Sequence, residues 1–132
     1  MAHGGMYTLG YTGWKPADIK QEVEQLHAVL LDIRFSPTSR HPQWSKKQLS
    51  ALLGERYMHS QALGNRNYKG GPTELVDYEA GKALVVSLLE HGTSVILMCA
   101  CPNVATCHRL EVATRLEADL GSWAEAVHLF HR

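Results

Sequence analysis

Short apolar runs alternate with segments of helical periodicity along this chain, and this alternation limits the fold more than any other feature. Continuous apolar runs occupy residues 6–11, 28–33 and 93–99, and a weaker one occupies 56–60. Continuous runs are typical of strands that helices cover on both faces, as in a parallel sheet. With an edge strand expected at 126–130, the pattern predicts about five strands.

Helical patterns fill the intervals between these runs. Pro16 suits the first turn of a helix, and Ile19, Val23 and Leu26 then form one apolar stripe. Further helices are predicted over the later intervals, at 45–53, from 73 or 77 to 91, and at 107–120.

Several of these helices carry recognisable end signals. Ser45 followed by Gln48 matches a capping box, and Gly54 can end the same helix. Gly92 stands where a left-handed C-terminal cap belongs. These signals place the helix boundaries independently of the apolar pattern.

The resulting order of strands and helices predicts an α/β fold with right-handed crossovers. The chain has 132 residues, enough for one ordinary domain and too few for two. We therefore expect a single-domain three-layer sandwich over 6–132, with a mostly parallel, about five-stranded, Rossmann-like sheet. Residues 1–5 are expected to form a disordered leader.

The amino-acid composition bears on which partners and which cellular location the protein can have. Lys plus Arg and Asp plus Glu number 13 each, so bulk charge favours neither nucleic acid nor an anionic membrane as a partner. No apolar run is long enough for a membrane span, and the first residues lack a signal-peptide pattern, so we expect a cytoplasmic protein. Nothing in the composition indicates an oligomeric state. The three cysteines are read as thiols, metal ligands or core residues rather than a disulfide framework.

Polar and reactive residues gather directly after the predicted strands. The segment 32–40 (DIRFSPTSR) follows the second strand, and the segment 99–109 (CACPNVATCHR) follows the fourth. Because ligands of open parallel sheets bind beyond the carboxyl ends of the strands, both segments are expected at one binding site.

These segments resemble a known family, domain of unknown function 488. The resemblance rests on Gly10-Tyr11-Thr12, Asp32-Ile33-Arg34 with Pro37, Ser39 and Arg40, Leu63-Gly64, Cys99-Ala100, and Cys107-His108-Arg109. It implies the same fold and site location for most of the chain, and the family has no settled activity. The residue after Cys99-Ala100 is usually acidic in the family but is Cys101 here, so a carboxylate role does not carry over.

A small anionic ligand, such as phosphate or a nucleotide, is the favoured partner of this site. Guanidinium and hydroxyl groups bind such anions well. The candidate ligand-binding residues are Arg34, Arg40, Arg109, Ser36, Ser39, Tyr11 and Thr12. As alternatives, Arg34 pairs with Asp32, and the serines only shape the turn.

Cys107 is the candidate nucleophile. With Thr106 as an N-cap, Cys107 would lie in the first helical turn, where the helix dipole, His108 and Arg109 favour a thiolate. Asp32 or His59 would then transfer protons. In the alternative reading, Cys107 simply packs beneath the helix.

The same cysteines also form a candidate metal site. Cys99, Cys101, Cys107 and His108 offer three thiolates and an imidazole, the usual ligands of zinc or iron. Against this, free cysteine is often just a small buried side chain, and Cys99 ends a strand.

Three hypotheses follow. The first is a cysteine-dependent hydrolase or transferase acting on a small anionic substrate. The second is a metal-binding or redox module without turnover of its own. The third is a non-catalytic nucleotide or nucleic-acid binding domain. Under each hypothesis, the aromatic side chains of Tyr11, Trp14 and Trp44 either line the pocket beside a base or sugar ring of the ligand or belong to the core.

Overall fold

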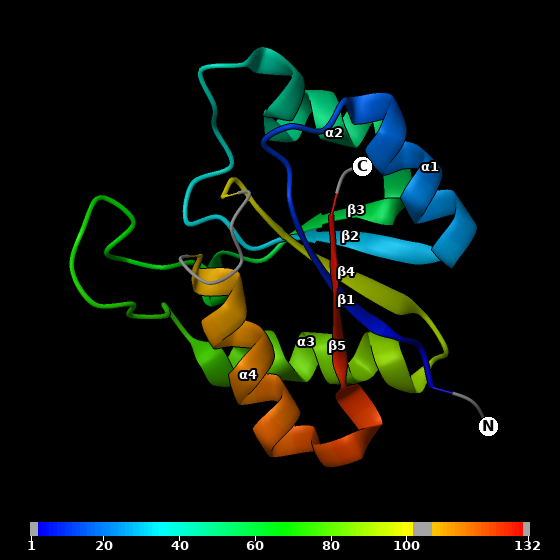
Figure 1. Ribbon diagram of the computed structural model, residues 1–132, viewed down its shortest axis with the longest axis vertical. Helices are drawn as coiled ribbons and strands as arrows, with labels where there is room; N and C mark the ends of the chain where they lie inside the picture. The colour runs from blue at the N-terminus through cyan, green and yellow to red at the C-terminus, as the bar shows by residue number, and fades with distance from the viewer. Residues whose placement is uncertain (1–2, 102–106, 131–132) are drawn as a thin grey trace.

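A computed structural model describes residues 3–101 and 107–130 (Figure 1). The strands are β1 (Met6–Gly10), β2 (Ala28–Asp32), β3 (Tyr57–His59), β4 (Ser94–Cys99) and β5 (Ala126–Leu129). The α-helices are α1 (Pro16–Leu26), α2 (Lys46–Leu53), α3 (Tyr78–Glu90) and α4 (His108–Leu120).

The strands form one open sheet in the order β3-β2-β4-β1-β5, and every neighbouring pair is parallel. This confirms the predicted α/β fold with a Rossmann-like parallel sheet. The strand that comes fourth in the chain lies in the middle, between β2 and β1. All carboxyl ends therefore point to one edge of the sheet, with the end of β4 at its centre.

The helices form the two outer layers. The chain moves through α1 and α2 from β1 to the β3 edge, then returns through α3 and α4 to β5. Crossovers of one hand place helices on opposite faces when the direction of travel reverses. Accordingly, α1 and α2 lie on one side of the sheet and α3 and α4 on the other (Figure 1).

The core has two halves that meet at β4. Val95, Leu97 and Cys99 belong to the half under α3 and α4, whereas Ile96 and Met98 belong to the half under α1 and α2. This is the alternation of a strand that is buried on both faces. It explains why the sequence of β4 is apolar throughout.

The predicted end signals are confirmed. Ser45 Oγ accepts a hydrogen bond from the Gln48 amide at 3.3 Å, and Gly54 ends α2 with a φ of 58°. Gly92 follows α3 with a φ of 78°, in the left-handed region that favours glycine.

The described residues before β1 are hydrogen-bonded to α3 and β4. The Gly4 amide donates to the Leu89 carbonyl at 3.0 Å, and the Gly5 amide donates to Ser94 Oγ at 2.9 Å. Of the predicted leader, residues 1–5, the structure describes residues 3–5, and residues 1–2 lie outside the described residues. In the described ranges, no helix has both the length and the apolar character needed to cross a bilayer.

Candidate functional site

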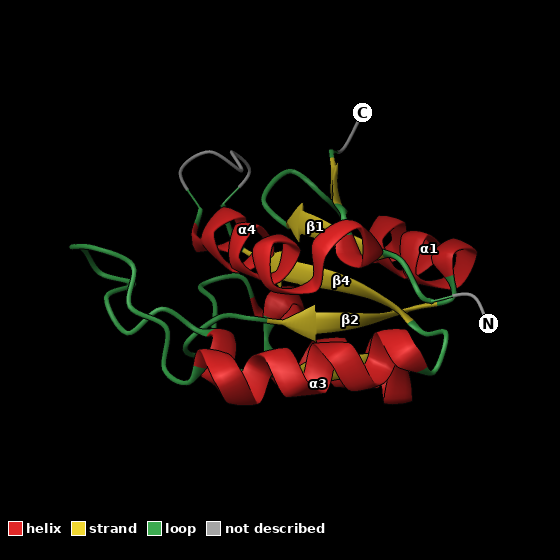
Figure 2. Ribbon diagram, turned by 90° about the horizontal axis from the view of Figure 1, so that it is seen from below, coloured by secondary structure: helices red, strands yellow, loops and turns green. Residues whose placement is uncertain are grey.

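A pocket of about 500 Å³ opens at the carboxyl ends of the strands. Its walls come from the segments after β1, β2 and β4, from the start of α4 and from the long loop between β3 and α3. In Figure 2 that loop extends from the side to which the strand arrows point. The lining residues are Tyr11, Arg34, Phe35, Ser36, Thr38, Asn65, Asn67, Tyr68, Gly70, Gly71, Thr73, Cys99, Ala100, Cys101, Cys107 and His108.

Asp32 and Arg34 form a buried ion pair at the end of β2. The Asp32 carboxylate accepts hydrogen bonds from Arg34 Nε at 2.8 Å and Nη2 at 2.6 Å, and from the Arg34 amide at 3.1 Å. The Tyr57 hydroxyl, from β3, donates a further bond at 2.6 Å. Asp32 is fully buried, so these partners replace the water that its carboxylate would otherwise bind. The Asp32–Arg34 pair, given above as the alternative role of Arg34, is therefore present.

These contacts shift the pKa values of the neighbouring groups. Burial lowers the pKa of Arg34, but the hydrogen bond and charge of Asp32 more than compensate, and the pKa lies above its ordinary value. Burial, followed by the hydrogen bond to Asp32, raises the pKa of the Tyr57 hydroxyl. Arg34 therefore remains charged, and Tyr57 remains a donor, across the physiological pH range.

One N–H donor of the Arg34 guanidinium makes no hydrogen bond to any residue that the structure describes. Its Nη1 is buried and has no hydrogen-bond partner among the described residues. Arg34 lines the pocket, and its guanidinium lies over the Tyr11 ring, 5.3 Å from the centroid. A buried N–H group without an acceptor is energetically costly.

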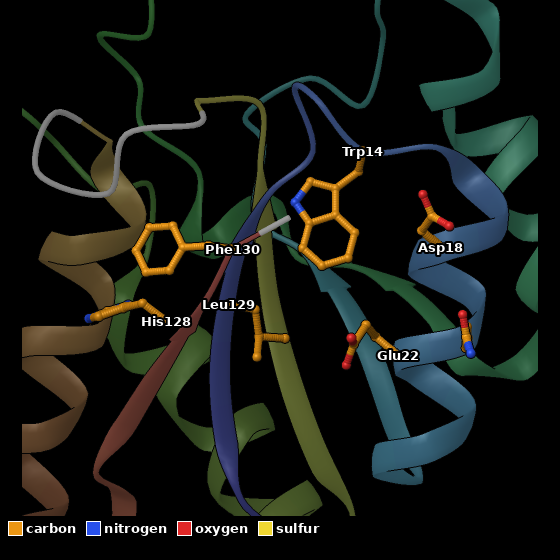
Figure 3. Close-up of a pocket in the computed structure, with 7 residues that line it drawn as sticks. Trp14, Asp18, Glu22, His128, Leu129 and Phe130 are labelled. Carbon is orange, nitrogen blue, oxygen red and sulfur yellow. The ribbon is translucent and has the colours of Figure 1, made fainter. Parts of the chain in front are cut away.

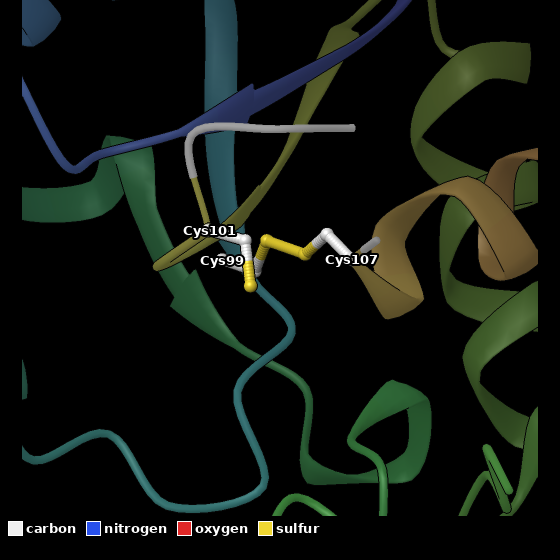
Figure 4. Close-up of side chains that lie close together, drawn as sticks. All are labelled: Cys99, Cys101 and Cys107. Atoms are coloured by element: carbon white, nitrogen blue, oxygen red, sulfur yellow. A yellow bond between two sulfur atoms is a disulfide. The ribbon is translucent and has the colours of Figure 1, made fainter. Parts of the chain in front are cut away.

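The three cysteines form one cluster on the same pocket (Figure 4). A disulfide joins Cys99, at the end of β4, to Cys107, and Cys101 carries a free thiol. All three Sγ atoms lie within 4.8 Å of one another. The cysteines were expected to be thiols, metal ligands or core residues. The disulfide corrects the expectation that none would pair: β4 and the start of α4 bring the two sulfurs together, and both cysteines also belong to the core.

Cys107 is the N-cap of α4 and not part of its first turn. Its predicted capping partner, Thr106, lies outside the described residues. An N-cap side chain faces the same unpaired amides as a first-turn residue, so the helix dipole favours a negative charge at this position as well.

Arg109 is fully buried behind the cysteines. Its Nη1 contacts Cys99 Sγ at 3.5 Å and donates to the Cys101 carbonyl, and its Nε donates to Thr8 Oγ1 at 3.3 Å. Burial lowers the pKa of Arg109, and the negative charge of a Cys101 thiolate acts against that shift. Among the described residues, no carboxylate forms an ion pair with this guanidinium.

Gly10 makes this arrangement of Arg109 and Cys101 sterically feasible. A Cβ atom at position 10 would lie 1.6 Å from the Cys101 carbonyl oxygen and 2.4 Å from Arg109 Nη1. Only glycine lets the chain after β4 pass this close to the end of β1.

A model of the family described as domain of unknown function DUF488 matches residues 19–116. The chain belongs to this family. No curated protein and no solved structure matches it.

Two histidines of this DUF488 chain serve as backbone partners. His108 Nε2 is 2.8 Å from the Ile33 carbonyl oxygen, and the metal-compatible cluster contains the cysteines and not His108. Burial lowers the pKa of His108, partly offset by its backbone hydrogen bonds. His59 Nε2 is 2.8 Å from the Arg34 carbonyl oxygen. Both side chains therefore hold the segment after β2 in place.

The other predicted ligand-binding residues are divided between the pocket and the surface. Ser36 lines the pocket, whereas Thr12 donates to the Ala100 carbonyl at 2.6 Å and Ser39 Oγ accepts from the His41 amide at 3.1 Å. Arg40 is exposed and is not among the lining residues. The three arginines that the sequence placed together are thus separated: Arg34 lines the pocket, Arg109 is buried behind it, and Arg40 lies outside.

The sequence missed the outer wall of the pocket. Asn65 Oδ1 accepts hydrogen bonds from the amides of Asn67 at 3.0 Å and Glu74 at 2.9 Å, which closes the long loop on itself. Tyr68 of this loop stacks on Phe35, with ring centroids 5.4 Å apart. The segment 63–72 (LGNRNYKGGP) is dense in turn residues, which predicts a loop, but no local pattern predicts where that loop folds.

The predicted aromatic wall is split. Tyr11 stacks on the buried Trp44, with centroids 4.7 Å apart, and also lines the carboxyl-end pocket. Trp14 instead lines a separate hollow between α1 and β5, with Asp18, Glu22 and Phe130 (Figure 3). Of these rings, only Tyr11 can contact a ligand next to the cysteines.

Proposed function

We propose that this protein is an enzyme that binds a small anionic molecule in the carboxyl-end pocket and, using the cysteine cluster, hydrolyses it or transfers a group from it. One observation carries the proposal: the same pocket is lined by the three cysteines and by Arg34, whose Nη1 has no partner among the described residues. A recognition group and a reactive group thus share one cavity.

The anionic character of the ligand follows from the donors around the pocket. Asp32 balances the charge of Arg34, so the unpaired N–H group, rather than net charge, is what attracts an oxygen. The N-terminus of the 13-residue helix α4 opens at the same place, through Cys107 and His108. Helix N-termini bind phosphate and carboxylate oxygens through their free amides. A volume of about 500 Å³ suits a metabolite rather than a polymer.

Cys107 is the residue to which we assign the chemistry. Its sulfur lies at the N-terminus of α4, next to Cys99, which contacts Arg109. In the reduced protein these positive fields favour a thiolate, which serves as nucleophile or ligand. Asp32 and His59 do not line the pocket, so the proposal gives both of them the role of holding Arg34.

Titration with inorganic phosphate tests the binding half of the proposal. Arg34→Lys keeps a charge beside Asp32 but removes the spare donor, and we expect phosphate to bind about tenfold more weakly, as for one lost charge-assisted hydrogen bond. Arg40→Ala, at an exposed position outside the pocket, is the matched control and should bind as the unaltered protein does. Equal affinity of Arg34→Lys and the unaltered protein would remove the anion site.

Alkylation tests the reactive half. With the disulfide reduced, Cys107 should react with iodoacetamide at pH 7 faster than a model thiol does, because its thiolate is stabilised. Bound phosphate should slow the reaction. A rate equal to that of a model thiol, unaffected by phosphate, would exclude an activated thiolate in the pocket.

A second candidate function, thiol–disulfide exchange, is favoured by the disulfide itself. The Cys99 and Cys107 thiols would reduce a small disulfide compound to two thiols while forming the bond seen here, with Cys101 as a third sulfur nearby. Equilibration with glutathione buffers, read by mass spectrometry, tests this. A pair that does not change state anywhere in the buffer range is not a redox couple.

A further inference from the structure

Three sulfurs in one cluster are more than a single nucleophile requires. Cys99, Cys101 and Cys107 come from the end of β4 and the start of α4, and their Sγ atoms lie within 4.8 Å of one another (Figure 4). Tetrahedral zinc with Zn–S bonds of about 2.3 Å holds its sulfurs about 3.8 Å apart. Two of these sulfurs are joined in the disulfide, so reduction has to separate them to that distance, and the three sulfurs are already close enough together for one ion to reach them all.

The backbone spacing also suits a bridging ion. The Cα atoms of Cys99 and Cys107 are 7.5 Å apart. Disulfides favour Cα separations of about 4.4–6.8 Å. Two sulfurs bound to one metal ion lie farther apart than two sulfurs joined by a disulfide. The reduced Cys99 and Cys107 can therefore bind a metal ion without any decrease in the distance between their Cα atoms.

The charge around the cluster is the independent observation. Arg109 is fully buried, contacts Cys99 Sγ at 3.5 Å, and forms no ion pair with a carboxylate among the described residues. A buried charge is stable only when something balances it. Three thiolates with a divalent ion carry one net negative charge, which the guanidinium of Arg109 neutralises.

We propose that the reduced protein binds one thiophilic divalent metal ion, of the zinc type, through Cys99, Cys101 and Cys107. The sulfurs cannot form the disulfide and hold the ion at the same time, so oxidation releases the metal. All three cysteines line the pocket, and a site with three protein ligands leaves a fourth position for water or a ligand atom. The metal site stands on the sulfur cluster; only the placing of an anion at its fourth position rests on the proposed function.

Cobalt and zinc binding to the reduced full chain tests this. One equivalent of Co²⁺ should give thiolate-to-metal charge-transfer absorption and the intense visible bands of a tetrahedral site, and Zn²⁺ should abolish both. Cys101→Ser, at a half-buried position, should bind Zn²⁺ at least about 100-fold more weakly. Thr73→Ala, which alters the wall of the same pocket without removing a sulfur, should leave Zn²⁺ affinity unchanged.

Protection from alkylation provides a readout that requires no variant. Zn²⁺ should shield all three cysteines of the reduced protein from iodoacetamide, counted by mass spectrometry. A cobalt spectrum without thiolate charge transfer, shielding of fewer than three cysteines, or unchanged Zn²⁺ affinity in Cys101→Ser would each overturn the metal site. Phosphate binding to metal-free protein, read with Arg34→Lys, reports on the anion pocket separately, so either idea can fail without the other.

Discussion

Arg34 and Arg109 are both buried arginines next to the pocket, but they differ in what surrounds them. Arg34 is held by the Asp32 carboxylate in a bidentate geometry. Arg109 contacts a sulfur, a hydroxyl and a carbonyl oxygen instead. Because a guanidinium is always charged at physiological pH, the first arginine is locally neutralised and the second acts on the cysteines. Arg109 is thus the guanidinium that contacts Cys99 Sγ, although it is not one of the residues that line the pocket.

Substitution of Gly10 tests how tightly these residues are packed. In Gly10→Ala the new methyl group meets the Cys101 carbonyl, which is backbone and cannot swing away, so we expect a loss of at least about 3 kcal/mol in the free energy of unfolding. Gly13→Ala is the comparison: no atom lies within 4 Å of its Cβ, and only its φ of 94° is unfavourable, at about 1 kcal/mol. Urea denaturation measures both, and equal losses would contradict the steric argument.

At the scale of elements, α3 and α4 are joined by side chains as well as by the core. The Tyr78 hydroxyl of α3 donates to Asp119 Oδ2 of α4 at 2.6 Å, and Lys82 Nζ lies 3.3 Å from the same oxygen. The Arg115 guanidinium packs over the Tyr78 ring, 3.9 Å from its centroid. These contacts hold α4 against α3. They therefore also fix the position of the N-terminus of α4, next to the cysteines.

This link predicts a pH dependence of stability. The hydrogen bond from Tyr78, with help from Lys82, lowers the pKa of Asp119 below its ordinary value. The unfolded chain then binds the proton more readily, so the stabilisation is full above the unfolded pKa of about 3.9 and is lost as the pH falls through the folded pKa. Asp119→Asn should therefore be less stable than the unaltered protein at pH 7, and the difference should shrink at pH 3.

Urea midpoints at the two pH values measure the difference. Glu125→Gln removes an exposed carboxylate elsewhere and should show no such convergence. A difference that stays constant between pH 7 and pH 3 would mean that Asp119 acts by shape and not by charge.

At the scale of the whole molecule, β4 unites the two halves of the core. Leu97 packs with α3 and α4, and its neighbour Ile96 packs with α1 and α2. Both halves of the core contain side chains of β4, so neither half can unfold while the other keeps this strand in place. We therefore expect the molecule to unfold in one cooperative transition.

Truncation on either face of β4 tests this. Leu97→Ala and Ile96→Ala should each cost about 2–5 kcal/mol, because both side chains are fully buried. In each variant, NMR signals from α1 and from α4 should disappear at the same urea concentration. Separate midpoints for the two helices would show that the halves are independent.

Much of the fold could be predicted because the signals are local. Apolar runs gave the strands within about a residue of β1 and β4, and Ser45, Gly54 and Gly92 marked helix ends where the structure has them. The Asp32–Arg34 pair was also predictable, since alternate residues on a strand share a face. Each of these features depends on residues a few positions apart.

The site was only partly predictable because its contacts join distant segments. Gly10 meets Cys101, Asn65 shapes a wall, and Arg109 reaches back to Thr8. Arg40 looked equivalent to Arg34 in sequence but lies at the surface. The strands, the helices and the edge of the sheet at which the reactive residues gather follow from local patterns in the sequence. The position of β4 between β2 and β1, which brings three sulfurs and one buried arginine together, depends on contacts between distant segments. The reason is physical: periodicity records which face of an element is buried, but not which element covers it.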